Sequence, residues 1–338
     1  LSSLDLSHFD TSLVTDMSHL FQTCSALEYI DVSNFNLRNV VNMQSMFLDC
    51  KSIKNLNTKN WVTSSANELD FLFGNNEKLE FLDLSNLNLG KVKSMAFMFQ
   101  NCASLTSIIL PKFENTPLNN LFGMFQNCFS LTNLDLSGFD TKNVVNMASM
   151  FKNCAKLKQL KLSNFDTSNV NNMNSMFTNC SSLESLDLSS FTIPKVTDLN
   201  YMFQYCEKLA SLDLSKFTGE SLTQMSFIFS ESKNLKKVDL SGLKANKLLY
   251  MNYAFRNCHS LEEVKLNNPN LESILGIEGL FQNCYNLKAF NSNLGNTPNL
   301  RIMRNMFLNC SSITSINLES LDTSSVSQMS SVFQNCYN

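Results

Sequence analysis

Apolar residues recur along this chain in two alternating patterns. Residues 1–6 have the spacing LxxLxL, which predicts a short strand with Leu4 and Leu6 on its buried face. In residues 14–24 the apolar residues lie three and four positions apart, which predicts a helix of about two to three turns. The polar residue before each methionine of this segment is the expected helix N-cap, as at Asn146, Asn172 and Asp198.

The whole pattern repeats every 26 residues without an insertion or a deletion. A phenylalanine in the second half of the unit marks the register thirteen times, at Phe21, Phe47, Phe73, Phe99, Phe125, Phe151, Phe177, Phe203, Phe229, Phe255, Phe281, Phe307 and Phe333. A strict period of this length indicates a solenoid, because one short unit cannot bury its own apolar face. The chain begins and ends inside a repeat, so we expect a fragment of a longer protein.

The unit also predicts the fold class. A strand, a turn and a short helix within about 20–29 residues are typical of leucine-rich repeats. We therefore predict an α/β repeat solenoid, a leucine-rich-repeat superhelix of 13 coils that forms one domain over residues 1–338. A parallel β-sheet would line its concave side and short helices its convex side. A three-sided parallel β-helix is the alternative, and the helical spacing of residues 14–24 counts against it.

Charge and composition exclude several function classes. Charged residues make up 16% of the chain, the net charge is -3, and the basic residues form no cluster. Nucleic acid is therefore not an expected partner. No run of about 18 apolar residues occurs, so this segment has no predicted membrane span. His8, His19 and His259 share no repeat position and no phosphate-binding loop occurs, so we expect neither catalysis nor a cofactor.

One family resemblance covers the whole chain. Residues 254–264, which read AFRNCHSLEEV, resemble the AFxxCxxLxxI core of the BspA-like leucine-rich repeats of bacterial and protist surface proteins. The commoner form here, MxxMFxxCxxLxxLDLSxFxTxxV, is similar to the mycoplasma-lipoprotein type of that family. Asn76 and Ser232 depart from it by replacing the cysteine. The resemblance implies a cell-surface or extracellular protein that binds other proteins or cell-surface ligands without catalysis.

All eleven cysteines occupy one repeat position: Cys24, Cys50, Cys102, Cys128, Cys154, Cys180, Cys206, Cys258, Cys284, Cys310 and Cys336. This position lies on the predicted buried face of the helix, so we interpret the cysteines as a structural row of small apolar residues with free thiols. No CxxC pair occurs that would hold a metal ion. Thiols in register point in parallel, so disulfides between coils are not expected.

An asparagine precedes the cysteine position in nine repeats: Asn75, Asn101, Asn127, Asn153, Asn179, Asn257, Asn283, Asn309 and Asn335. We interpret this row as a ladder of buried amides that satisfy backbone groups where the coil turns. Asn179 and Asn309 also fit the glycosylation sequon. A buried ladder would disfavour glycan attachment at both.

One outward position of the predicted strand is often aspartate, at Asp5, Asp31, Asp83, Asp135, Asp187, Asp213 and Asp239. The last three belong to consecutive coils, so their carboxylates would lie about 5 Å apart and repel one another. Two interpretations stay open. The row is either solvated and hydrogen-bonded to flanking serines such as Ser189, Ser215 and Ser241, or a concave binding row for a basic partner or a divalent cation.

These observations favour a non-enzymatic cell-surface or extracellular protein that mediates protein–protein contacts or cell adhesion and structural assembly. One alternative is an extracellular filament of continuous or head-to-tail stacked repeats, because the terminal coils would expose an apolar layer and an unpaired strand edge. The other alternative is an intracellular interaction scaffold.

Overall fold

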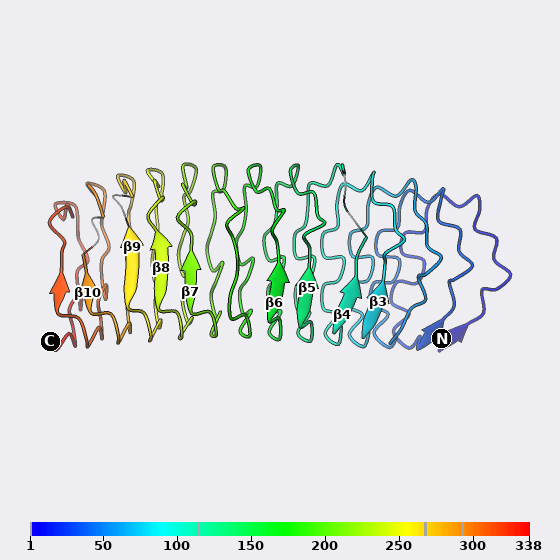
Figure 1. The fold of residues 1–338 in the computed structure, drawn as a ribbon, viewed down its shortest axis with the longest axis horizontal. Coiled ribbons are helices and arrows are strands. Elements are labelled where there is room, and N and C mark those ends of the chain that lie inside the picture. The colour runs from blue at the N-terminus through cyan, green and yellow to red at the C-terminus, as the bar shows by residue number, and fades with distance from the viewer. Residues whose placement is uncertain (1, 112, 114, 267–268, 292–293) are drawn as a thin grey trace. The chain divides into compact units, whose positions relative to one another are not determined.

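The computed structural model describes every residue except 1, 112, 114, 267–268 and 292–293. The described chain is a parallel β-solenoid of about 12 turns. It divides into two compact units, Leu1–Phe165 (unit 1) and Asp166–Asn338 (unit 2). Each 26-residue repeat is one coil of its unit, and the strands stand side by side along the coils (Figure 1).

Unit 1 has six short strands among its described residues. They are β1 (Ser3–Leu4), β2 (Tyr29–Ile30), β3 (Phe81–Asp83), β4 (Ser107–Ile109), β5 (Asn133–Asp135) and β6 (Gln159–Lys161). The strands pair in parallel as β1–β2, β3–β4 and β5–β6. Every partner lies 26 positions further along the chain, as Tyr29 does from Ser3. The sequence period is therefore the hydrogen-bonding register.

Unit 2 has five strands in its described part. They are β7 (Ser211–Asp213), β8 (Lys237–Leu240), β9 (Glu263–Leu266), β10 (Ala289–Phe290) and β11 (Ser315–Ile316). A three-stranded sheet has the order β7–β8–β9, and β10 pairs with β11. In each unit a second row of parallel bridges also joins successive coils, from Asp16 to Asn146 and from Asn172 to Gln328.

The phenylalanines that mark the repeat stack in the core of each unit. Ring centroids of successive coils lie 5.0–6.0 Å apart from Phe21 to Phe151 in unit 1. They lie 5.1–6.0 Å apart from Phe177 to Phe333 in unit 2. All of these rings are buried except Phe333 in the last coil. The rows give every interior coil aromatic contacts with both neighbours.

The predicted helices are wrong: none of the described residues is helical. In the coil that contains Phe125, every second N–H group from Leu121 to Asn127 donates to a carbonyl of the next coil, at 2.8–3.0 Å. The N–H groups of Met124, Gln126 and Cys128 donate to the carbonyl three residues back, at 3.0–3.2 Å. An α-helix needs each N–H to bond four residues back within its own segment. Half of the donors here instead join neighbouring coils.

Two left-handed residues in each coil make this arrangement possible. Gly123 has a φ of 59° and Asn127 a φ of 64°, and the same two positions have positive φ in the other coils. A positive φ at the third residue of a hydrogen-bonded turn is typical of type II turns. Tandem turns of this kind place an apolar side chain inward every three to four residues. Their spacing therefore matches that of an amphipathic helix.

The expected N-cap residues have a different role. Asn146 forms a parallel bridge with Asn120, and Asn172 forms one with Asp198. The side-chain oxygens of Asn146, Asn172 and Asp198 accept the N–H group two residues on, at 2.8–3.0 Å. Each side chain thus closes a local turn at the start of the turn segment. The predicted leucine-rich-repeat solenoid is therefore present as a parallel β-solenoid, and the described residues form turns where the short convex helices were expected.

Candidate interaction surface on the sheet face

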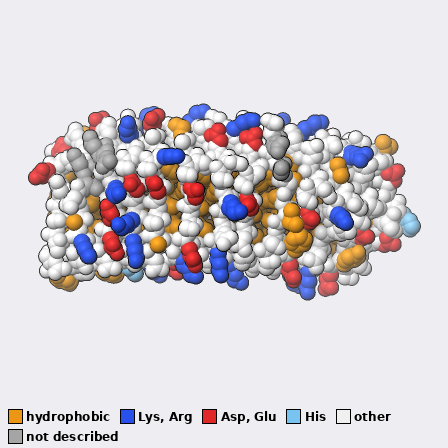
Figure 2. All heavy atoms as spheres, viewed as in Figure 1, with side chains coloured by type: hydrophobic (Ala, Val, Ile, Leu, Met, Phe, Trp, Pro, Cys, Tyr) orange, Lys and Arg blue, Asp and Glu red, His pale blue; other side chains and the backbone are white. Residues whose placement is uncertain are grey.

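The sheet face of each unit consists of the outward side chains at the positions of Ser3 and Asp5 and every 26 residues further on. Strand pairing fixes these positions, because neighbouring residues such as Leu6 and Ile30 are buried. Acidic, basic and hydrophobic side chains all appear on the strand-bearing side (Figure 2). All seven aspartates of the predicted row lie on this face and are exposed or half-exposed.

Each of these aspartates closes a turn with the residue two positions on. In all seven, the Oδ1 atom accepts the backbone N–H of a serine at 2.9–3.0 Å. Hydrogen bonds from the Ser189 and Ser215 backbone and hydroxyl groups lower the pKa values of Asp187 and Asp213. The same cause lowers the pKa of Asp135 to about 2, with a further contribution from Lys161. The carboxylates of Asp135, Asp187 and Asp213 are therefore negative at neutral pH.

The aspartates differ in their charged neighbours. Lys161 contacts Asp135 at 3.1 Å, and Lys265 contacts Asp239 at 3.8 Å. A third pair on this face joins Lys237 to Glu263 at 3.4 Å. These pairs are exposed and therefore stabilise the fold little, but they neutralise charge locally.

The expected row of three equally spaced carboxylates is incomplete. Asp213 and Asp239 are register partners in β7 and β8, whereas Asp187 lies outside the described strands. Lys216 also lowers the pKa of Asp187, and Lys216 and Lys265 act in the same way on Asp213. The lysines thus offset the predicted repulsion. Among the described residues, no group of three or more His, Cys, Asp or Glu is placed to hold a metal ion.

Exposed apolar side chains complete the sheet face of unit 1. Tyr29 is 63% exposed, Phe81 42% and Ile109 46%. Sequence reasoning missed these residues, because it followed the aspartate position and the buried leucines. For Tyr29 and Phe81 the available signal was an aromatic residue two positions before the aspartate, where the other coils have none. Ile109 occupies the aspartate position itself.

The cysteine row is a row of hydrogen-bond donors. Nine thiols donate to the carbonyl of the core phenylalanine 29 residues back, at 3.0–3.2 Å. The two departures make the same contact: Asn76 Nδ2 donates to Phe47 O at 3.0 Å, and Ser232 Oγ donates to Phe203 O at 2.8 Å. Burial raises the pKa of Cys154 to about 12, so its thiol stays protonated. Treating the position as merely apolar missed this donor role.

The asparagines before the cysteines form a ladder, but a different one from that expected. All but the exposed Asn335 are half-buried. Their amides bond to one another: Asn127 Nδ2 donates to Asn101 Oδ1 at 2.5 Å, and Asn309 Nδ2 donates to Asn283 Oδ1 at 2.6 Å. The backbone conformation also favours asparagine at this position. These residues have φ near 60°, in the left-handed region that asparagine tolerates better than most residues do. The side-chain amide of Asn309, one of the two sequon asparagines, therefore already donates a hydrogen bond to Asn283. Asn179, the other sequon asparagine, lies in the same row.

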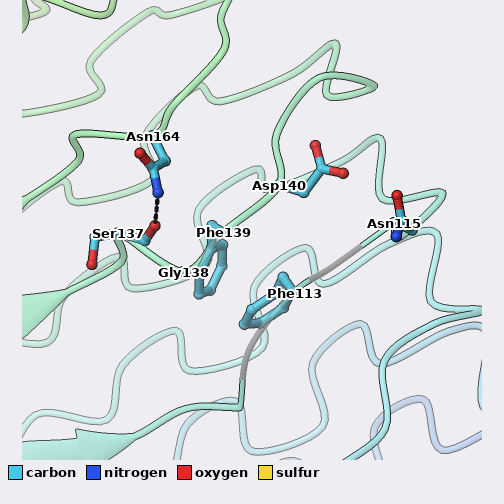
Figure 3. Close-up of a pocket in the computed structure, with 7 residues that line it drawn as sticks. All are labelled: Phe113, Asn115, Ser137, Gly138, Phe139, Asp140 and Asn164. Atoms are coloured by element: carbon cyan, nitrogen blue, oxygen red, sulfur yellow. Dashed lines mark hydrogen bonds between the residues drawn. The ribbon is translucent and has the colours of Figure 1, made fainter.

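One hollow of unit 1 is lined by residues that follow strands β4 and β5 and by Asn164. It has a volume of about 590 Å³ and is lined by Phe113, Asn115, Ser137, Gly138, Phe139, Asp140 and Asn164 (Figure 3). The two rings lie with centroids 3.6 Å apart, and Asn164 Nδ2 donates to Ser137 O at 2.5 Å. Asp140 is the one ionisable residue of the seven, and Lys142 contacts it at 3.0 Å. An acid–base pair, which catalysis usually requires, is not formed by these lining residues.

The parallel coils, the 26-residue register and the inward leucine rows define a β-solenoid of the leucine-rich-repeat kind. The chain belongs to the family described as "Mycoplasma protein of unknown function, DUF285", whose model matches residues 2–113, 119–243 and 249–338. A search of curated proteins returned no match. No helix in the described part of the chain is long and apolar enough to cross a membrane.

The chain is also similar to several solved structures, at low sequence identity. A leucine-rich repeat protein from Bacteroides ovatus is 19% identical, with 96% of this chain and 81% of that chain covered and a TM-score of 0.43. A leucine-rich cell surface protein from Faecalibacterium prausnitzii is 16% identical over 75% and 76% of the two chains, with a TM-score of 0.33. A chain of the Drosophila Toll–Spätzle complex is 17% identical over 90% and 37%, with a TM-score of 0.32.

Proposed function

We propose that this protein is a BspA-like surface or extracellular module that binds other proteins through its sheet face and takes part in adhesion. One observation carries the proposal: residues inside the coils are nearly constant, whereas the sheet-face residues change from coil to coil. The core phenylalanine recurs in every repeat. The position of Ser3 is taken in later coils by Tyr29, Phe81, Gln159, Lys237 and Glu263. A surface that varies on a constant scaffold is suited to recognition.

The recurring positions of the repeat also favour binding over catalysis. The core phenylalanine, the cysteine and the asparagine before it recur in most coils, whereas catalysis usually needs several unlike groups that converge in a cleft. Leucine-rich-repeat solenoids are typically non-enzymatic interaction scaffolds. The motif resemblance to BspA-like surface proteins supports a location at the cell surface. We further propose that residues 1–338 form one solenoid domain.

Photo-crosslinking on living cells tests the function. A photoreactive amino acid at Asn133, exposed in β5, would report on the sheet face, and one at Lys91, exposed in a loop, would serve as the control. We expect saturable crosslinks to protein from position 133 and few from position 91. Equal crosslinking at both positions, or none at position 133, would contradict a binding role for this face. Protease treatment of intact cells would test the location, and protection from it would favour the intracellular scaffold.

Filament formation is a second candidate. Phe9 and Leu13 in the first coil are 57% and 88% exposed, and Phe333 in the last coil is 52% exposed. A further coil or a second copy could cover such side chains in a head-to-tail contact. Light scattering of the full-length protein over a range of concentrations tests this, and a monomer at every concentration would exclude it.

A further inference from the structure

Two coils of unit 1 carry the same exposed tetrapeptide pattern. Residues 28–31 read Glu-Tyr-Ile-Asp, and residues 80–83 read Glu-Phe-Leu-Asp. In both, the third residue is buried, and an exposed aromatic side chain lies between two carboxylates that are exposed or half-exposed. None of the other coils combines an aromatic residue with both carboxylates at these positions. We name residues 28–31 and 80–83 the two aromatic–acidic subsites.

The carboxylates of these subsites form no ion pairs in the described part of the chain: none joins Glu28, Asp31, Glu80 or Asp83 to a lysine or an arginine. This contrasts with the sheet face in unit 2, where Lys237 and Glu263 neutralise each other. Asp31 and Asp83 instead bond to Ser33 and Ser85, which lowers their pKa values and keeps them charged. The nearest cationic influence is on Asp83, whose pKa the charge of Lys59 helps to lower.

The sum of charges indicates the kind of partner. The two subsites contribute four negative charges, and the same positions of the coil between them, residues 54–57, contribute one positive charge from Lys54. The strip therefore has a net charge of -3 and presents two exposed aromatic rings. Lysine and arginine match it, because their charged ends pair with carboxylates and their alkyl stems pack on aromatic rings.

We propose that the two aromatic–acidic subsites of unit 1 bind an extended polypeptide segment that carries basic side chains at about every third residue. The subsites are two coils apart, which corresponds to roughly 10 Å at the usual strand spacing. A polyproline II segment advances about 3.1 Å per residue and returns to the same side every third residue. Basic residues at positions i and i+3 of such a segment can therefore reach both subsites at once.

This inference rests on the proposed function, since it names the partner chemistry of the same face. The probe is a fluorescent 12-residue peptide of four Lys-Ser-Pro repeats, and its partner control has glutamate in place of lysine. Binding to the whole protein is measured by fluorescence anisotropy at low and at physiological salt. We expect saturable binding of the lysine peptide, weakened by salt, and no binding of the glutamate peptide.

Substitutions at the subsites separate their two components. The double variant Asp31→Asn, Asp83→Asn should weaken binding about tenfold, because it removes two carboxylates. Its turns should persist, because Asn317 occupies the equivalent position and its Oδ1 accepts the Glu319 N–H at 3.0 Å. The matched control is Asp10→Asn, Asp16→Asn. These two aspartates close the same kind of turn in unit 1 away from the sheet face.

The aromatic component has its own variant. Serine already occupies the register partners of both rings, Ser3 in β1 and Ser107 in β4, so Tyr29→Ser with Phe81→Ser preserves the strands. We expect this variant to bind at least about threefold more weakly. The proposal is overturned if either subsite variant binds within twofold of the parent. It is also overturned if the Asp10, Asp16 control loses as much affinity as the Asp31, Asp83 variant.

The two proposals fail in different ways. If crosslinks from position 133 persist while the lysine peptide does not bind, the sheet face still binds proteins and only the basic partner is excluded. If position 133 gives no crosslinks, the proposed function itself fails, whatever the peptide does.

Discussion

The donor role of the cysteine row can be tested at Cys154. Its thiol is fully buried and lies 3.2 Å from the carbonyl oxygen of Phe125 in the preceding coil. The same oxygen also accepts the backbone N–H of Cys128 at 3.1 Å. Cys154→Ala removes one of these two donors. Cys154→Ser keeps a donor at the position, as Ser232 does in its own coil.

The geometry sets the size of the effect. Cys154→Ala removes a buried sulfur, comparable to a methylene worth about 0.8 kcal/mol. It also removes a hydrogen bond, whose net contribution to stability is about 0.5–1.5 kcal/mol. Because the carbonyl of Phe125 keeps its backbone donor, we expect the low end of this range and a total loss of about 1–2 kcal/mol. Cys154→Ser should lose less than about 1 kcal/mol, because the hydroxyl replaces the thiol as donor.

The relative stabilities of the two variants distinguish the interpretation of the cysteine as a hydrogen-bond donor from its interpretation as a small apolar residue. If the position only requires a small apolar residue, burying a serine hydroxyl would cost about 1–3 kcal/mol, and alanine would be the more stable variant. Urea unfolding gives the free energy of unfolding, and hydrogen exchange at the Cys128 amide reports the local effect. A Cys154→Ser protein less stable than Cys154→Ala would refute the donor interpretation.

Three further predictions follow from the same structure. Thiol labelling should be slow in the folded protein and reach all eleven cysteines after unfolding without reductant, whereas a lower count would reveal disulfides. Phe151→Ala should cost about 3–5 kcal/mol, with hydrogen-exchange protection lost first in the adjoining coils and not uniformly. The pKa of Asp135 is about 2 in the folded protein against an ordinary 3.8, so its contribution to stability is complete above pH 3.8 and is lost as the pH falls towards 2. Asp135→Asn should remove this part of the acid sensitivity in urea unfolding measured between pH 5 and 2.

The sequence predicted the repeat and its register but not the local structure of the second half. The 26-residue period is the step of strand pairing, as between Ser3 and Tyr29. The helix prediction failed because tandem turns and a helix give nearly the same spacing of inward side chains. The distinguishing signal was asparagine before the cysteine, as at Asn127, since asparagine tolerates the left-handed conformation better than most residues do.

The candidate surface was partly predictable for a similar reason. Strand alternation is enough to place Asp31 and Asp83 outside. The partners of these carboxylates depend on neighbouring coils, and the aromatic residues Tyr29 and Phe81 occupy a position that has no constant residue type. Repeat analysis emphasises what is shared between coils, so it found the scaffold and missed the residues that differ.

Stability and the proposed recognition therefore depend on different side chains of the same strand. Ile30 is buried and packs within the stack, while its neighbour Tyr29 is 63% exposed. The backbone bonds between coils involve main-chain atoms only, so they are indifferent to the residue at an outward position. Substitutions on the sheet face can thus change its surface chemistry without disturbing the stack, whereas a change at Phe125 or Cys154 also affects neighbouring coils. This separation explains how a strictly periodic chain can present a surface that is not periodic.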